Sequence, residues 1–383
     1  SGPIIESFIQ SLLWRKKETV TEKLVEYVNS PVLKSKENQE LFWDTIISVT
    51  SIPDYYFNAY WLHKKLMKFS LPDRDAWWTI YLKEKFHDES GVKRLIDWAW
   101  NINDKKHISD ESVKLSSITL SWLHTSTNRK LRDSATKALI CLLENRINVL
   151  IELLKEFEDV NDPYIYERLF AVAYGCAVRT EQRDMLIDLS RYIYETIFKD
   201  KKEIYPHILL RDYARGVIEY TSHLEYNLGF DISIVRPPYK SIFTKHFPTN
   251  EEIDGKYKLS NKSKDFKDYY WAQNSILSSM VTEYGRGISR YGDFGRYTFQ
   301  SALRTWNVDT NLLSNLAVKW IFEKYGYDKD KHGKFDRNIN SRHWSDDAHH
   351  ERIGKKYQWI ALYEMLARVS DNHIKYADWS YEK

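Results

Sequence analysis

The residues best suited to metal binding or acid–base chemistry gather near the C-terminal end of the sequence. His343, His349 and His350 lie close together with Asp346 and Asp347. Imidazole and carboxylate groups are zinc ligands, so a metal-dependent hydrolase could be built from this segment. However, His349 and His350 are adjacent and would point apart on a helix, and no His-Glu-x-x-His pair occurs. We therefore expect an exposed polar loop here, with no metal bound.

A second candidate metal site begins at Asp328, where carboxylates stand at the first and third positions of a possible calcium loop and glycine stands sixth. The twelfth position, which requires a bidentate glutamate, is Ile339, and the fifth is His332. A polar turn is therefore the better interpretation. The sequence also has no Gly-x-Ser-x-Gly elbow and no cysteine beside a candidate base. We expect no catalytic residues and no cofactor.

A segment rich in glycine and arginine, residues 284–297, carries four glycines in eleven residues. Such a density indicates tight turns or a close approach of two backbones. The glycines do not have dinucleotide-binding spacing, so a phosphate cradle is disfavoured against a structural turn or an interface. Arginine and aromatic side chains dominate the energetics of protein interfaces. The residues that we expect to contact a partner are Arg286, Arg290, Tyr291, Phe294, Arg296, His343 and Trp344.

The overall charge is nearly balanced, with 57 Lys and Arg against 54 Asp and Glu. Duplex-binding proteins usually carry a larger basic excess, because neutralising phosphates supplies most of their affinity. Basic and acidic residues are also interleaved, as in Arg132-Asp133. Nucleic acid is therefore a disfavoured partner, although a local basic patch is compatible with the balanced total.

The compartment and the completeness of the chain are also suggested by the sequence. Cys141 and Cys176 lie in apolar helical stretches, which is typical of reduced, buried thiols, and no apolar run reaches about 18 residues. We expect a cytoplasmic protein. Ser1-Gly2-Pro3 resembles the remnant of a cleaved tag, so we expect the chain to be a segment of a longer protein.

The elements that must position the candidate metal and partner residues are predicted to be helices, because most of the sequence has helical periodicity. Apolar residues recur at steps of three and four from Ile4 to Val28, and prolines end successive runs. From Ser109 to Tyr226 the pattern predicts helices of about 12 to 20 residues joined by short polar loops. Ser109 is the expected N-cap of the first of these helices.

Three of these predicted helices share a pattern in which an arginine is followed three residues later by alanine. The arginines are separated by 36 and 43 residues, close to the period of HEAT and armadillo repeats. The small residue allows helices to approach closely, and we expect the arginine to reach Asp133, Asp212 or helix-end carbonyls. The pairs are Arg132 with Ala135, Arg168 with Ala171, and Arg211 with Ala214.

The predicted fold is all-α, a HEAT/armadillo-like α-solenoid with a C-terminal helical module. Residues 229–267 interrupt the helical rhythm with prolines and exposed lysines, which favours a solvated connector over a contact loop for an acidic or phosphate-bearing partner. The expected segments are 1–108, N-terminal helical repeats; 109–228, HEAT-like repeats; 229–267, an irregular linker; and 268–383, the C-terminal module.

Several segments carry a resemblance to a known family. Asp162-Pro163, Leu131-Arg132-Asp133 and Leu210-Arg211-Asp212 resemble HEAT repeats in general. Residues 159–220, 295–303, 313–319 and 351–359 resemble the C-terminal sensor region of bacterial antiviral STAND NTPases, the Avs-type defence proteins. The resemblance covers about residues 110–372.

The resemblance implies a sensor that recognises a phage protein, the portal or the large terminase subunit, and so activates the NTPase and effector of a larger defence protein. No Gly-x-x-x-x-Gly-Lys-Ser/Thr loop occurs in this chain, so it would not itself be an enzyme. A HEAT-like nucleic-acid-binding module and a generic protein-interaction scaffold are the alternatives. No membrane partner is expected, and oligomerisation is expected only in the full-length parent.

Overall fold

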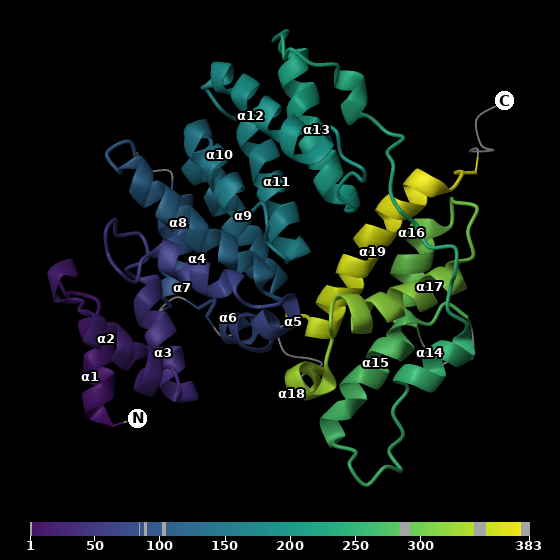
Figure 1. Cartoon of the computed structure of the whole chain (residues 1–383), viewed down its shortest axis with the longest axis horizontal. Helices are drawn as coiled ribbons and strands as arrows, with labels where there is room; N and C mark the ends of the chain where they lie inside the picture. The colour runs from purple at the N-terminus through teal and green to yellow at the C-terminus, as the bar shows by residue number, and fades with distance from the viewer. Residues whose placement is uncertain are drawn as a thin grey trace. The chain divides into compact units, whose positions relative to one another are not determined.

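The secondary structure is helical throughout the part of the chain that the computed structural model describes, residues 2–83, 85–87, 90–101, 105–283, 292–340 and 350–376 (Figure 1). These residues contain no strand, and an isolated antiparallel bridge joins Trp306 to Lys375. The prediction of an all-α protein is confirmed. No helix in the described ranges is long and apolar enough to cross a membrane.

The chain divides into two compact units that differ from the four predicted segments. Unit 1 comprises Ser1–Ser70 and Trp77–Leu189, and unit 2 comprises Leu71–Ala76 and Ser190–Lys383. The difference arises because helix α13 (Ile208–His223), within the predicted repeat segment, packs against α19 (Ile353–Asn372) of unit 2.

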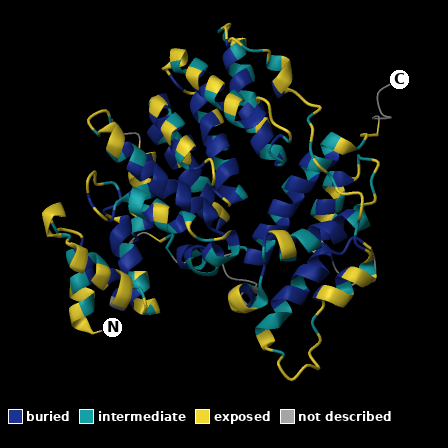
Figure 2. Cartoon of the chain, in the orientation of Figure 1, coloured by how far each residue is buried: buried dark blue, intermediate teal, exposed yellow. Residues whose placement is uncertain are grey.

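Unit 1 contains two sets of helices that pack side by side. In one set α9 lies between α7 and α11, and in the other α8 lies between α4 and α10, while α8 also packs against α9. Buried residues concentrate where these helices face one another (Figure 2). The helices of unit 1 are α1 (Pro3–Ser11), α2 (Glu22–Tyr27), α3 (Lys36–Ile47), α4 (Ala59–Met67), α6 (Ile80–Lys83), α7 (Gly91–Trp100), α8 (Asp110–Trp122), α9 (Arg129–Leu143), α10 (Ile147–Glu156) and α11 (Pro163–Ala177).

Polar side chains start the helices of unit 1 where the sequence places them. The Ser109 hydroxyl accepts a hydrogen bond from the backbone N–H of Ser112, which confirms the predicted N-cap of α8. Asn128 and Asp162 cap α9 and α11 in the same way. Each cap satisfies an N–H group that has no partner within its own helix.

The three aligned arginines do not all occupy equivalent positions. Arg132 and Arg211 each stand four residues after the N-cap of their helix, and each donates to the carbonyl six residues earlier, at 2.6 Å and 2.8 Å. Arg168 stands six residues after its cap, Asp162. The predicted alignment therefore holds for two helices and is displaced by two residues in α11. Accordingly Ala135 and Ala214 are fully buried, whereas Ala171 is only half-buried.

An ion pair and a glycine hold α9 and α11 closely together. Arg168 Nη1 donates to Asp133 Oδ1 at 2.9 Å, as the sequence predicts for a seam-crossing arginine. A Cβ atom on Gly175 would lie 2.5 Å from Cδ1 of Ile140, so glycine lets the two helices pack tightly.

Unit 2 is built around α19, whose buried residues lie on all of its faces. It packs against α13, α15, α17 and α18, and Figure 2 shows it as mostly buried. A long helix that is buried all round is central to its fold. The other helices of this unit are α14 (Asn250–Tyr257), α15 (Trp271–Met280), α16 (Ser301–Leu303), α17 (Thr310–Lys319) and α18 (Lys329–Asn340); α5 (Leu71–Arg74) also belongs to it, and α12 (Leu186–Ile193) spans the boundary between the units.

The segment Leu71–Ala76 is held within unit 2 by polar contacts. Lys356 Nζ lies 2.8 Å from Asp75 Oδ1, and both side chains are fully buried. The Asp328 backbone N–H donates to His332 Nδ1, which leaves Nε2–H to donate to the Pro72 carbonyl at 2.9 Å. These contacts fix a short piece of the N-terminal half into the C-terminal unit.

The predicted irregular linker, residues 229–267, contains two helical elements. Its second half includes α14, which begins with a capping box formed by Thr249 and Glu252, and its first half includes a 3-10 turn at Ile232–Val235. The apolar pattern of α14 is too short to show in the sequence, since only Ile253 and Tyr257 of that helix are buried.

The glycines of the segment 284–297 bring two backbones together, as predicted. A Cβ atom would lie 1.8 Å from the Val281 carbonyl oxygen at Gly292 and 2.5 Å from the Met280 carbonyl oxygen at Gly295. The close approach is confirmed for these two glycines. Gly285 lies outside the described residues, as does Gly287.

Candidate functional site

The predicted partner-contact residues fall into three groups. Phe294 is 1% exposed: its ring packs edge-on against Trp359 at 5.0 Å, and Lys355 Nζ lies 4.5 Å from its centroid. This burial corrects the expectation for Phe294, because an interface residue must be accessible. Arg296 is half-buried. Outside the described residues lie Arg286, Arg290, Tyr291, His343 and Trp344.

Of the two candidate metal sites, the one at residues 328–339 lies within the described residues, and the histidine-rich one lies mostly outside them. Asp328 acts as an N-cap of α18, accepting hydrogen bonds from the backbone N–H groups of Asp330 at 2.7 Å and Lys331 at 3.3 Å. Of the histidine-rich set, His350 alone is described. Across the described ranges, no three His, Cys, Asp or Glu side chains converge in a way that could hold a metal ion.

An open groove of about 370 Å³ lies on the surface of unit 1, where α8 and α10 run beside the start of α12. Its apolar part is formed by Val149, Ile151 and Met185, of which Val149 is buried and the other two are half-buried. The remaining lining is polar or charged: Asp110, Glu111, Lys114, Asn148, Glu152 and Asp188. The groove therefore combines an apolar floor with a charged rim.

The electrostatics of the groove are dominated by carboxylates. Asp110 pairs with Arg146 at 2.8 Å, while Glu152 accepts from Lys155 at 2.8 Å, and this hydrogen bond lowers the pKa of Glu152. Lys114 is the only basic side chain in the lining. The lining holds four carboxylates against one ammonium, and Arg146 and Lys155 at its edge pair with two of the four.

Lys114 is fixed at the edge of the groove by its neighbours. Its Nζ lies 2.9 Å from Glu156 and 3.8 Å from Glu152, and 5.4 Å from the ring centroid of Tyr60. Burial lowers the pKa of Lys114, but the hydrogen bond and charge of Glu156 outweigh this effect, so its pKa is raised. Lys114 is therefore a positive anchor that positions two of the surrounding carboxylates.

Sequence reasoning did not find this groove. Asp110 and Glu111 stand out in the sequence only as favourable residues in the first turn of a helix. Nothing in the spacing of residues 110–114, 148–152 and 185–188 shows that they meet, because their proximity depends on how successive helices pack.

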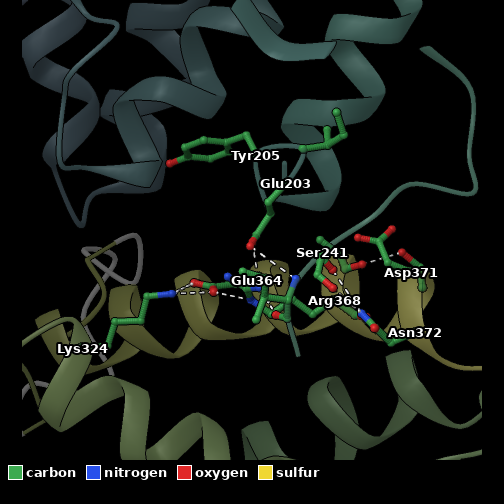
Figure 3. A network of polar contacts seen from close by, with 12 residues as sticks. Glu203, Tyr205, Ser241, Lys324, Glu364, Arg368, Asp371 and Asn372 are labelled. Carbon is green, nitrogen blue, oxygen red and sulfur yellow. Dashed lines mark hydrogen bonds and ion pairs between the residues drawn. The ribbon is translucent and has the colours of Figure 1, made fainter. Parts of the chain in front are cut away.

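A network of charged and polar side chains in unit 2 surrounds Glu364 (Figure 3). Glu364 accepts from Lys324 at 2.5 Å and 2.6 Å, from Tyr325 Oη at 2.7 Å and from Arg368 Nε at 2.6 Å. Arg368 also lies 2.7 Å from Glu203. Burial raises the pKa of Glu364, but the two cations and the tyrosine hydroxyl outweigh this, so its pKa is lowered.

A second buried pair extends the polar contacts of α19. Arg211 Nη1 lies 2.9 Å from Asp371, and both side chains are almost fully buried. The same guanidinium donates to the carbonyls of Ile204 and Tyr205, both at 2.8 Å, and stacks 5.1 Å from the ring centroid of Tyr239. These groups satisfy one another, which is typical of a structural network rather than of a reactive site.

Comparison with known proteins finds no family model, no curated protein and no solved structure that matches this chain. The groove of unit 1 is therefore interpreted from its geometry and chemistry alone.

Proposed function

We propose that this chain is a recognition scaffold, an α-solenoid of HEAT/armadillo type with a C-terminal helical module, that binds a folded protein partner. The observation that carries the proposal is the groove of unit 1, where α8, α10 and the start of α12 contribute side chains to one surface. In this proposal the chain has no catalytic activity of its own.

The packing of unit 1 supports a repeat scaffold. The sets α7, α9, α11 and α4, α8, α10 place each helix beside a helix of the same set, and short loops join the sets. Stacked helix pairs form extended surfaces suited to large partners rather than small substrates.

The lining of the groove supports a protein as the partner. Protein interfaces combine an apolar centre with a polar rim. In this groove Ile151 and Met185 form the apolar centre. The polar rim is formed by Glu111, Glu152 and Asp188. The excess of carboxylates favours a partner surface that presents lysine or arginine. Such side chains place their apolar stems on an apolar floor and their charges at the rim.

The resemblance to Avs-type sensors supports a more specific proposal. The partner would be a phage portal or large terminase subunit, and its binding would trigger the NTPase and effector of a larger defence protein. Helices α11, α12 and α13 lie in or overlap residues 159–220, the first of the segments that carry that resemblance.

Co-purification tests the proposal. The chain would be co-expressed with portal and large terminase proteins from several phages, and a complex with one of these classes is expected. The variant E111K/E152K/D188K should weaken that complex at least about tenfold, because it reverses the charge of the rim over the apolar floor.

The matched control is E18K/E22K/E26K, which makes the same charge change at exposed residues of unit 1 outside the groove. It should bind like the unmodified chain. Absence of any complex removes the phage-protein proposal, and equal binding by the two variants removes the groove as the contact site.

A further inference from the structure

Positive charge is concentrated in two segments of unit 2. Residues 256–270 contain five lysines against two aspartates, and α18 contains four basic residues against two aspartates. Together they hold an excess of five positive charges, more than the net +3 of the whole chain, so the remaining residues carry an excess of two negative charges. Acidic residues flank both segments, with Glu251, Glu252 and Asp254 before the first and Asp328 before the second.

The structure brings these two segments together. Lys267 Nζ lies 3.6 Å from Asp330, and Arg337 Nε lies 3.1 Å from Asp268. Lys329 Nζ lies 4.8 Å from the ring centroid of Tyr270. The end of the loop between α14 and α15, residues 267–270, therefore lies against one face of α18. We use the name lysine surface for the basic residues of this loop and of that helix face: Lys258, Lys262, Lys264, Lys267, Lys329, Lys334 and Arg337.

Helical geometry places Lys334 on the same face of α18. Asp330 and Arg337 both turn toward residues 268–270, and a Cβ atom on Gly333 would lie 2.9 Å from the Tyr269 carbonyl oxygen. Positions spaced by three and four residues share one side of a helix. Lys334 lies between Asp330 and Arg337 in that spacing and is exposed, so it stands at the edge of the lysine surface.

Four ammonium groups of the lysine surface have no ion pair within the described residues. Lys258, Lys262, Lys264 and Lys334 are exposed, and their side chains contact no carboxylate there, whereas Lys267 and Lys329 share the carboxylate of Asp330. Figure 2 shows the loop that carries three of the four as mostly exposed. These lysines remain available to an external anion.

The lysine surface offers a partner mainly its cations. No large hydrophobic side chain of residues 256–270 or 329–340 is exposed, and Phe266, Tyr269 and Tyr270 are half-buried. Binding to a nucleic-acid backbone draws its energy from lysine and arginine on phosphates. We infer that the lysine surface binds the phosphate backbone of a nucleic-acid strand, an activity separate from the protein binding proposed for unit 1.

Fluorescence anisotropy with a labelled 30-nucleotide single-stranded DNA, using the whole chain without any protein partner, tests the inference. Four phosphate contacts on a single strand predict a log–log salt slope of about −3, and hence about a 50-fold loss of affinity between 50 and 200 mM salt. The variant K262E/K264E/K334E should lower affinity at least about tenfold and bring the slope to about −1.

The matched control is K16E/K23E/K34E, which makes the same charge change at exposed lysines of unit 1. It should retain the affinity and slope of the unmodified chain. Equal losses in the two variants, or no salt-dependent binding at 50 mM salt, would overturn the inference. Displacement of the DNA by poly-glutamate as readily as by unlabelled DNA would also overturn it, in favour of an acidic protein partner.

Discussion

At the scale of single residues, Glu167 makes the stability of the packing between α9 and α11 depend on pH. The residue is 8% exposed, and burial raises its pKa from 4.5 to about 7, against the lowering effect of Arg168 and Arg132. The folded state therefore holds this proton more tightly than the unfolded chain does. The contribution of Glu167 to stability is complete below its unfolded pKa near 4.5 and is lost as pH rises through about 7.

The substitution Glu167→Gln should remove this dependence. The variant and the unmodified chain should have similar stability near pH 4.5, and the variant should gain up to about 3 kcal/mol at pH 8, because it no longer buries a charge. Denaturant unfolding of unit 1 from pH 4.5 to 8 measures the difference. Parallel stability profiles would contradict the assignment.

The buried ion pair between Lys356 and Asp75 makes a second prediction at this scale. Lys356→Met should destabilise unit 2 by about 3 to 5 kcal/mol, because it removes the cation that lies 2.8 Å from the buried Asp75 carboxylate. The double variant Asp75→Leu with Lys356→Met should recover most of this loss, since neither charge is then buried. Thermal unfolding measures both effects, and a single variant as stable as the unmodified chain would contradict the prediction.

At the scale of elements, a side chain of α18 caps the start of α19. Asp336 accepts hydrogen bonds from the backbone N–H groups of Ile353 at 2.6 Å and Gly354 at 2.9 Å, and from the Tyr327 hydroxyl at 3.1 Å. Burial raises the pKa of Asp336, against the lowering effect of Arg352 and of these backbone donors. The first turn of the central helix thus depends on a residue of another element.

Asp336→Ala should therefore cost about 2 to 4 kcal/mol, because it leaves two buried N–H groups and a buried hydroxyl without their acceptor. Amide hydrogen exchange should accelerate first at residues 353–356, whereas exchange in α9 of unit 1 should stay unchanged and serves as the internal control. Unaltered protection of the first turn of α19 would show that the cap is dispensable.

At the scale of the whole molecule, unit 2 includes residues 71–76, although residues 77–189 lie between them and the rest of that unit in the sequence. Residues 190–383 expressed alone lack Asp75 and the Pro72 carbonyl, which are partners of Lys356 and His332 in the intact chain. We expect this fragment to be less helical and less soluble than the whole chain.

Lys356→Met within that fragment should restore part of its helicity, since the substitution removes the buried charge that lies against Asp75 in the intact chain. Circular dichroism and gel filtration of the two fragments provide the measurement. A fragment 190–383 that is folded and monomeric without the substitution would show that residues 71–76 are not required.

Local patterns in the sequence predict what depends on neighbouring residues. The all-α class, the N-cap at Ser109 and the close backbone approach at Gly292 follow from periodicity, hydrogen-bonding side chains and missing Cβ atoms. The repeat alignment was wrong by two residues at Arg168, because the match was made on residue type and not on the helix start, Asp162. The short helix α14 was missed because eight residues carry too little pattern.

The sequence by itself determined the helical class, the starts of several helices and the balanced total charge, since each of these depends on local chain geometry or on composition. Only the tertiary structure decided that the acidic groove gathers residues from 110 to 188, that Lys267 lies beside α18, and that Asp75 pairs with Lys356. The physical reason is the same for all three. Contacts between distant segments depend on which helix faces pack together, and many packings are compatible with one amphipathic pattern.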